Sequence, residues 1–201
     1  MKLDNTIIYL IGIPAVGKYS TAKALGRLAG VKVIDSQLVN SPIFTIVGYD
    51  GTDKIPVKEE AWKHIEKIRK TVLAFIRDHA TADASFVFTN VLNNSPGDRR
   101  LFRKIERIAR HRNATFVPVW LTCSTPEIRK RKNRPDRRER MKDIDLTNIK
   151  YWTEEFEQLK LKHPNGITID TSRSKPEETA KKIIAHARRI GKLATEHTEI
   201  G

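Results

Sequence analysis

Cysteine is nearly absent from the sequence: Cys123 is the single thiol among 201 residues. One thiol excludes an internal disulfide framework and a thiolate metal cluster. Long apolar runs are also missing, since none approaches the roughly 20 residues that a membrane-spanning helix needs. The N-terminal residues pass directly into the first apolar segment, which we interpret as a strand and not as a signal peptide. These features favour a soluble protein of the cytoplasm with no membrane partner.

Acidic residues are in the minority: 24 Asp and Glu stand against 38 Lys and Arg, which gives a net charge of +14. The excess is concentrated in residues 99–112 and 129–142, and the rest of the chain is nearly neutral. A basic helix over 99–112 could follow nucleic-acid phosphates. Because this segment holds one aromatic residue for stacking on bases, nucleic acid is an alternative partner and not the leading one.

Five short apolar runs are expected to form strands, with helical spacing between them. They cover residues 6–11, 31–34, 85–89, 115–122 and 166–170. Most of them are continuous in β-branched or aromatic residues and do not alternate cleanly, which is typical of strands covered on both faces. Strands that alternate with helices predict an α/β fold with a parallel sheet.

Helical spacing predicts helices over residues 18–29 and 57–79, the second with Trp62 and Phe75 on its apolar face. Ser95 and Asp98 fit a capping box, so we interpret Asp98 as a helix cap and not as a catalyst. The length suits one domain, which we expect over residues 1–191. The last residues, 192–201, have little to bury and are expected to fray.

The stretch GIPAVGKYST, residues 12–21, directly follows the first strand and fits the phosphate-loop (Walker A) pattern G-x-x-x-x-G-K-[ST] at Gly12, Gly17 and Lys18. A strand, a glycine loop and a helix N-terminus together surround an anion with backbone N–H groups. Lys18 adds a charge near the β- and γ-phosphates. The predicted nucleotide contacts are Gly12, Pro14, Ala15, Val16, Gly17, Lys18, Tyr19, Ser20 and Thr21.

Tyr19 departs from this pattern, because it stands where a small hydroxyl normally binds Mg²⁺. Its ring is too large for that role. We therefore expect Mg²⁺ to be held by the nucleotide phosphates, by waters and by an outer carboxylate such as Asp35 acting through water.

The chain resembles P-loop small-molecule kinases of the shikimate, gluconate and nucleoside-monophosphate kinase type, and bacterial AAA-type ATP-binding proteins often labelled shikimate kinase. The matching segments are GIPAVGKYSTAKALG, VIDSQLVNSPIF, SFVFTNVL, VPVWLTCSTPEIRKR and ITIDTSRSKPEETAKKI. The resemblance implies a three-layer P-loop fold with a five-stranded parallel sheet in the order 2-3-1-4-5. It also implies an acceptor region near residues 36–62 and a basic lid near residues 124–145.

Asp35 ends the second expected strand, at the edge where ligands bind to open α/β sheets. A carboxylate there can accept the proton of a substrate hydroxyl, and the resemblance implies the same role; the alternative is a surface cap of a turn. Trp62 belongs either to the acceptor region or to the core. The predicted acceptor contacts are Asp35, Gln37, Asn40, Phe44 and Asn90.

The resemblance further implies that lid arginines stabilise the transferring phosphoryl group. Arg131 and Arg137 match best, with Arg134 and Lys142 next. In similar kinases the loop after the fifth strand runs past the adenine. That loop here contains Thr171, Ser172 and Arg173.

The leading interpretation is a kinase that uses ATP and Mg²⁺ to phosphorylate a hydroxyl of a small molecule. Lys18, Asp35, Arg131 and Arg137 are its expected catalytic residues. One alternative is a nucleic-acid end kinase or RNA-binding P-loop protein. Another is a nucleotide-binding protein without kinase activity, because Tyr19 and Asn90 are both poor partners for a metal.

Overall fold

The structure, a computed structural model, describes residues 2–52, 57–132, 141–142 and 149–198. These residues form one parallel sheet with the order β2-β3-β1-β4-β5. Its strands are β1 (Thr6–Ile11), β2 (Lys32–Asp35), β3 (Phe86–Asn90), β4 (Thr115–Thr122) and β5 (Ile167–Asp170). The expected sheet order is confirmed, and each strand lies within one residue of its expected bounds.

The central strand β1 is buried along its whole length. Ile8 and Leu10 point into one apolar cluster, whereas Ile7, Tyr9 and Ile11 point into a second cluster on the opposite face. Because both faces are covered, the strand needs apolar residues at every position and shows no alternation.

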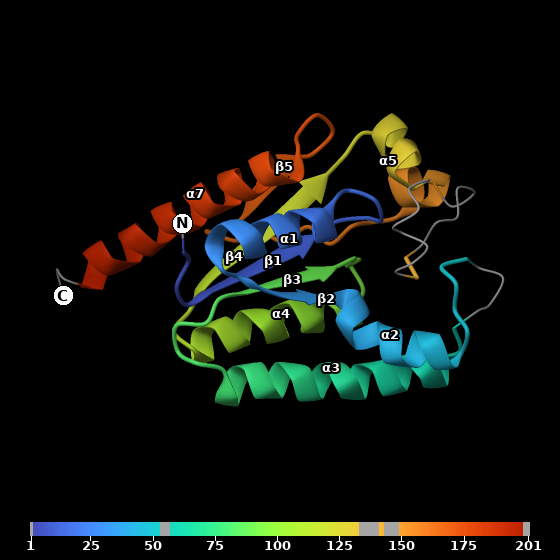
Figure 1. The fold of residues 1–201 in the computed structure, drawn as a ribbon, viewed down its shortest axis with the longest axis horizontal. Coiled ribbons are helices and arrows are strands. Elements are labelled where there is room, and N and C mark those ends of the chain that lie inside the picture. The colour runs from blue at the N-terminus through green and yellow to red at the C-terminus, as the bar shows by residue number, and fades with distance from the viewer. Residues whose placement is uncertain (1, 53–56, 133–140, 143–148, 199–201) are drawn as a thin grey trace.

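Helices cover both faces of the sheet (Figure 1). α1 (Lys18–Ala29) and α7 (Pro176–Thr198) pack on one face, and α3 (Glu59–His79) and α4 (Pro96–His111) pack on the other. α1 has the bounds that the sequence predicts. α7 continues beyond residue 191 into the expected tail. None of the described helices is long and apolar enough to cross a membrane.

A helix that the sequence did not predict, α2 (Ser36–Ile46), follows β2 directly. It contains Pro42, which cannot donate a backbone hydrogen bond and usually disfavours a helix interior. Tertiary packing compensates, since Val39 and Phe44 of α2 form a small cluster with Ile65 of α3. α2 therefore brings the expected acceptor region against α3.

Two short helices lie at the carboxyl edge of the sheet, α5 (Thr125–Lys132) and the π-helical turn η1 (Tyr151–Glu155). α5 belongs to the expected lid. Of that lid, only residues 124–132, 141 and 142 are within the described part of the chain, so Arg134 and Arg137 lie outside it.

The expected apolar face of α3 is wrong at two positions. Trp62 is 45% exposed and Phe75 is 62% exposed. Trp62 packs edge-to-face on Phe44, and Phe75 contacts the ring of His79 on its own helix. Helical spacing alone could not distinguish these two side chains from the buried ones.

The basic segment 99–112 forms most of α4, whose apolar stripe is buried against the sheet. The cap is confirmed, because the backbone N–H of Asp98 donates to Ser95 Oγ at 3.3 Å. The Asp98 carboxylate in turn accepts the N–H of Asn93 at 2.8 Å. At the other end, Arg112 donates to the backbone carbonyls of Ile76 and Thr81. This arginine of the basic segment therefore holds α4 against the end of α3 and the turn after it.

Candidate nucleotide and acceptor site

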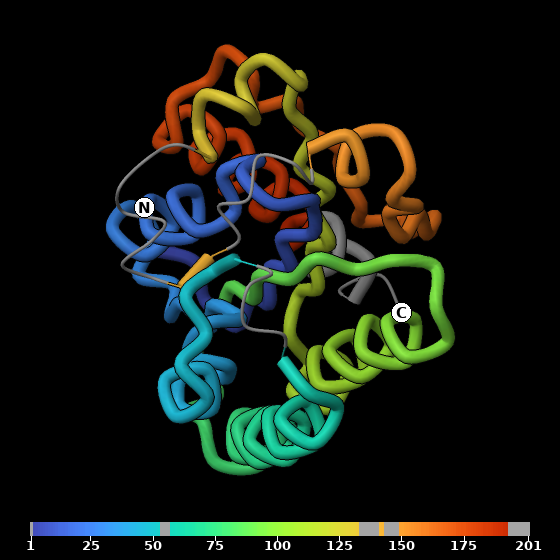
Figure 2. The backbone as a smooth tube through the Cα atoms, turned by 90° about the vertical axis from the view of Figure 1, so that its right-hand side faces the viewer, coloured from blue at the N-terminus to red at the C-terminus, as the bar shows by residue number. Residues whose placement is uncertain are grey.

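A cavity of about 470 Å³ opens at the carboxyl edge of the sheet. Figure 2 looks onto this edge and shows α2, α5 and η1 around it. The walls come from the phosphate loop, α2, α3, the end of β3 and the start of α4, together with Arg131, Lys142 and Trp152. Ligands of open α/β sheets bind at this edge.

The phosphate loop closes tightly against β4. A Cβ atom on Gly12 would lie 2.7 Å from the carbonyl oxygen of Leu121, so only glycine fits there. Gly17 has a φ of 94°, a left-handed conformation that glycine adopts without strain. Pro14, Ala15 and Ser20 line the cavity.

Two residues of the predicted nucleotide-binding set are turned into the core. Val16 is fully buried and Thr21 is 2% exposed. Neither is among the described residues that line the cavity. Val16 therefore contributes to the loop through its backbone, and the side chain of Thr21 packs behind it.

Lys18 begins α1 and lines the cavity. Its ammonium group donates to the carbonyl oxygens of Gly12 at 2.5 Å and Ile13 at 2.9 Å. The loop thus holds a fixed positive charge beside the N–H groups at the start of α1, which is the arrangement that binds polyphosphates.

The ring of Tyr19 lies close to two further cations, Lys142 and Lys23. The Nζ atom of Lys142 is 4.8 Å from the centroid of the Tyr19 ring, and the Nζ atom of Lys23 is 5.7 Å from it. Such contacts between a cation and a ring face are attractive. Lys142 also lies 3.3 Å from Asp35 Oδ2, so it connects the phosphate loop to the end of β2.

Asp35 is 3% exposed and accepts a hydrogen bond of 2.6 Å from the Thr89 hydroxyl. It does not line the cavity that the phosphate loop opens into; it lines two neighbouring ones, of about 590 and 20 Å³. Tyr19, Gln37 and Met141 line both the phosphate-loop cavity and the larger of these two, so they form the wall between them. Gln37 Nε2 donates to the Met141 carbonyl at 2.9 Å and holds this wall together.

The described residues do not fit a Mg²⁺ ion bound directly by the protein. The position after Lys18 presents a ring face that contacts lysines, not a small hydroxyl. No group of three or more His, Cys, Asp or Glu in the described part of the chain could hold a metal. Asp35 as a water-mediated ligand stays a prediction, and it requires Lys142 to leave the carboxylate.

Arg131 lies over the phosphate loop from α5. Its Nε donates to Glu127 at 2.8 Å, and its terminal nitrogens donate to the hydroxyl and carbonyl oxygens of Thr171 at 3.1 and 2.8 Å. A Cβ atom on Gly17 would be 3.5 Å from this guanidinium group. Arg131 also lines the cavity, so it can reach an anion held by the loop.

The loop after β5 supports the site from outside the cavity. The buried hydroxyl of Thr171 lies 2.8 Å from the Val16 carbonyl and 3.0 Å from the Thr122 carbonyl. Ser172 donates to Asp170 and lowers the pKa of that carboxyl below its usual value. Arg173 is exposed. None of Thr171, Ser172 and Arg173 is among the described lining residues, so their contact with adenine stays a prediction.

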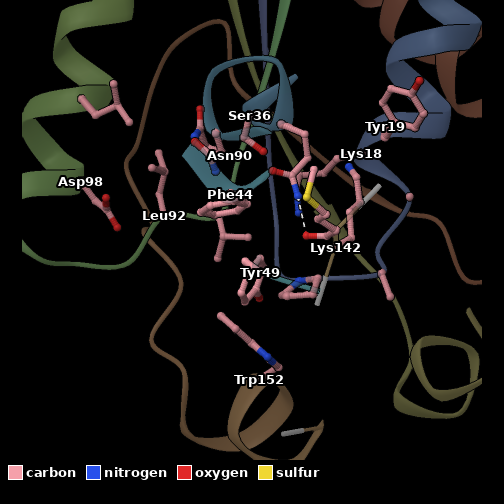
Figure 3. Close-up of a pocket in the computed structure, with 18 of the residues that line it drawn as sticks. Lys18, Tyr19, Ser36, Phe44, Tyr49, Asn90, Leu92, Asp98, Lys142 and Trp152 are labelled. Atoms are coloured by element: carbon pink, nitrogen blue, oxygen red, sulfur yellow. Dashed lines mark hydrogen bonds between the residues drawn. The ribbon is translucent and has the colours of Figure 1, made fainter. Parts of the chain in front are cut away.

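Four of the predicted acceptor contacts line the cavity. They are Gln37, Asn40, Phe44 and Asn90. Figure 3 shows Lys18 and Lys142 on one side of the cavity, Asp98 and Leu92 on the other, and Phe44 and Tyr49 between them. The core residue Tyr9 orients Asn90, because its hydroxyl donates to Asn90 Oδ1 at 3.1 Å.

Sequence reasoning missed Arg69, Tyr49 and Trp152, which also line the cavity. Tyr49 follows α2, which was not recognised as a helix. Trp152 belongs to the aromatic segment YWTEEF, residues 151–156, a few residues after the expected basic lid, and this clustering of rings near a lid was the available signal.

No family model matches the sequence, and no curated protein is significantly similar to it. Solved structures do match. A gluconokinase from Sinorhizobium meliloti 1021 aligns over 98% of this chain and 99% of its own, with a TM-score of 0.60 and 15% identity. A putative kinase from Chloroflexus aurantiacus aligns over 92% and 98%, with a TM-score of 0.62 and 12% identity.

The Mycobacterium tuberculosis APS kinase CysC, solved with AMPPNP and APS, aligns over 92% of this chain and 99% of its own, with a TM-score of 0.55 and 14% identity. These likenesses show that the chain has the fold of P-loop small-molecule kinases.

Proposed function

We propose that this protein is an ATP-dependent phosphotransferase that moves the γ-phosphoryl group to a hydroxyl of a small molecule. One observation carries the proposal: the loop that holds Lys18 opens into the same cavity that α2 lines with Gln37, Asn40 and Phe44. A phosphate site and an acceptor-sized space therefore share one enclosure. Phosphoryl transfer depends mainly on such positioning and on charge neutralisation.

Each charged residue has a proposed role. Lys18 and the loop N–H groups bind the β- and γ-phosphates, and Arg131 stabilises the charge on the transferring group. In the transfer, the acceptor oxygen bonds to the γ-phosphorus and the bond from that phosphorus to the bridging oxygen breaks, which releases ADP. Asp35 accepts the proton of the acceptor hydroxyl. Arg137, outside the described residues, stays a candidate for a second lid contact.

The role of Asp35 requires a rearrangement at the site. Its carboxylate is behind the wall of Tyr19, Gln37 and Met141 and is paired with Lys142. Movement of Lys142 from Asp35 toward the phosphates would open this wall, because Met141 precedes Lys142 directly in the chain. Lys142 would then add positive charge where the transfer takes place.

The test is a screen of hydroxyl-bearing metabolites with γ-labelled ATP, followed by Lys18→Ala on any acceptor found. We expect turnover to fall by about 10²–10³-fold, since Lys18 is a fixed charge at the transferring group. The matched control is Lys181→Ala, which removes an exposed lysine of α7 and leaves turnover unchanged. Unchanged turnover in Lys18→Ala, with an unchanged melting temperature, contradicts the proposal.

Two other functions are distinguished by simple measurements. A nucleotide-binding protein without kinase activity binds ATP but consumes none with any acceptor. A nucleic-acid end kinase is supported by the exposed arginines on one side of α4, at positions 100, 103, 107 and 110. Binding of a 5′-hydroxyl oligonucleotide over a salt series tests it, because phosphate contacts weaken steeply with salt.

A further inference from the structure

The acceptor half of the cavity is built from aromatic rings. Phe44, Tyr49, Trp62 and Trp152 line it, and they come from α2, the turn after it, α3 and η1. The ring centroids of Phe44 and Tyr49 are 4.7 Å apart, and Phe44 meets Trp62 edge-to-face at 5.6 Å. Figure 3 shows Trp152 extending from η1 toward Tyr49 and Phe44. Four segments of the chain thus place aromatic rings around the same part of the cavity.

Two buried polar atoms beside these rings have no hydrogen-bond partner among the described residues. They are the indole N–H of Trp152, a donor, and Oδ1 of Asn40, an acceptor. A buried polar group without a partner costs about 1–3 kcal/mol. Both residues line the cavity, although the two atoms themselves are not exposed to it, so a bound molecule that offers one acceptor and one donor would satisfy them after a small rotation of these side chains. The wall is therefore suited to a ring with polar atoms at its edge.

The described residues that line this end of the cavity carry no surplus of positive charge. Arg69 lines the cavity, but its guanidinium group is 2.6 Å from the Glu66 carboxylate. Asp98 lines it as well, and burial raises the pKa of its carboxyl above the usual value. One arginine therefore faces two carboxyl groups. This end gains nothing from an acceptor with a negative charge of its own.

We infer, resting on the proposed kinase function, that the phosphoryl acceptor is an uncharged alcohol carried on a flat aromatic or heteroaromatic ring. The ring lies among Phe44, Tyr49, Trp62 and Trp152, where offset or edge-to-face contacts stabilise it. Trp152 and Asn40 bond to polar atoms at its edge, and the hydroxyl points toward Lys18. A sugar acid would cover the same rings with polar groups, and the arginine described at this end, Arg69, is already paired with Glu66.

Calorimetry tests the inference with the full chain and saturating ADP, which keeps the ligands out of the nucleotide side. The aromatic alcohols are thymidine and 2-(4-nitrophenyl)ethanol, and the anionic comparators are gluconate and thymidine 5′-monophosphate. We expect at least one aromatic alcohol to bind about tenfold more tightly than either comparator.

Three variants locate the binding. Trp62→Ala should weaken it by about tenfold through the lost ring contact. Trp152→Phe, which keeps a ring and removes the N–H group, should weaken it by about fivefold. Phe75→Ala is the matched control, because Phe75 is an exposed ring of the same helix outside the cavity lining. Melting temperatures confirm that each variant is folded.

Tighter binding of gluconate or thymidine 5′-monophosphate than of both aromatic alcohols overturns the inference. So does an affinity that neither Trp62→Ala nor Trp152→Phe changes. If ADP binds and no aromatic alcohol does, the inference fails while the proposed kinase function stands. If ADP does not bind, the kinase function fails, and the same titrations without ADP still decide the ring preference.

Discussion

The ammonium group of Lys142 lies 3.3 Å from the carboxylate of Asp35, although 107 positions separate the two residues in the sequence. Asp35 ends β2, and Lys142 belongs to the expected lid. The same ammonium group makes a cation–π contact with the ring of Tyr19, at 4.8 Å from the ring centroid. One lysine therefore contacts both the proposed base and the residue that replaces the usual Mg²⁺-binding hydroxyl.

Breaking this pair should destabilise the protein. Lys142→Met leaves the nearly buried Asp35 carboxylate without its ammonium partner, and we expect a loss of about 2 kcal/mol of unfolding free energy. In the double variant with Asp35→Asn the loss should be smaller than the sum of the single losses by at least about 1 kcal/mol. Urea unfolding measures this coupling apart from the other contacts of each side chain. Additive losses would show that the two groups do not interact.

Tyr19→Thr should restore a direct oxygen ligand for Mg²⁺. We expect the apparent affinity for Mg²⁺ in the kinase reaction to rise about tenfold, which corresponds to about 1.4 kcal/mol. Tyr19→Phe is the matched control, since it keeps the ring under Lys142 and loses only the phenol. Titration of Mg²⁺ at fixed ATP measures both. If Tyr19→Thr shows no gain, Tyr19 does not occupy the place of the missing ligand.

Arg131→Lys should impair turnover more than the binding of ATP. A lysine keeps the charge but cannot span Glu127 and both oxygens of Thr171, as the guanidinium group does. We expect kcat to fall by about 10–100-fold, because the charge is no longer fixed over the loop. Arg129→Lys on the same helix is exposed and serves as the control. Equal effects of the two substitutions would remove Arg131 from the proposed mechanism.

The stability of the protein should fall on mild acidification because of His163. Burial lowers the pKa of His163 below 6.5, despite Glu106 at 3.5 Å. Its Nδ1 accepts the N–H of Asn165, which also requires that nitrogen to be unprotonated. The unfolded chain therefore takes up this proton first, so the contribution is complete above pH 6.5 and is lost as the pH falls toward the folded value.

Unfolding free energies at pH 7.5 and pH 5 should differ less in His163→Gln than in the natural protein. An identical pH dependence in the two proteins would show that His163 stays unprotonated or titrates normally. The residue lies outside the cavity lining, so kinase assays at pH 7.5 serve to confirm that the variant is intact.

Local sequence patterns predict most of the strands and helices of the fold. Most strands could be found because they are continuous apolar runs that need no partner to be recognised, as in β1, although β5 alternates apolar and polar residues. Their order in the sheet came from the resemblance and not from the pattern. α2 could not be found, because Pro42 and its polar neighbours are typical of a loop, and only packing of Phe44 against α3 makes the helix stable.

The residues of the candidate site likewise include some that a local sequence pattern predicts and some that only the folded chain brings together. The phosphate loop is contiguous in the sequence, so its spacing alone predicts the position of Lys18 in the cavity. Asp35 was correctly placed at the end of β2, but its burial and its pairing with Lys142 depend on distant parts of the chain. Trp152 reaches the cavity from a segment more than 100 positions after α2, and no local pattern specifies that approach.

The close fit of Gly12 against Leu121 has a mechanical consequence. With no side chain between them, the backbone of the phosphate loop rests on the backbone of β4. A shift of β4 by a few tenths of an ångström cannot be absorbed by a rotating side chain and must displace the loop. α5 begins three residues after β4 ends and carries Arg131. A displacement of α5 that moves β4 would therefore also move the phosphate loop, in addition to any effect through the contacts of Arg131 with Thr171 and of Thr171 with Val16.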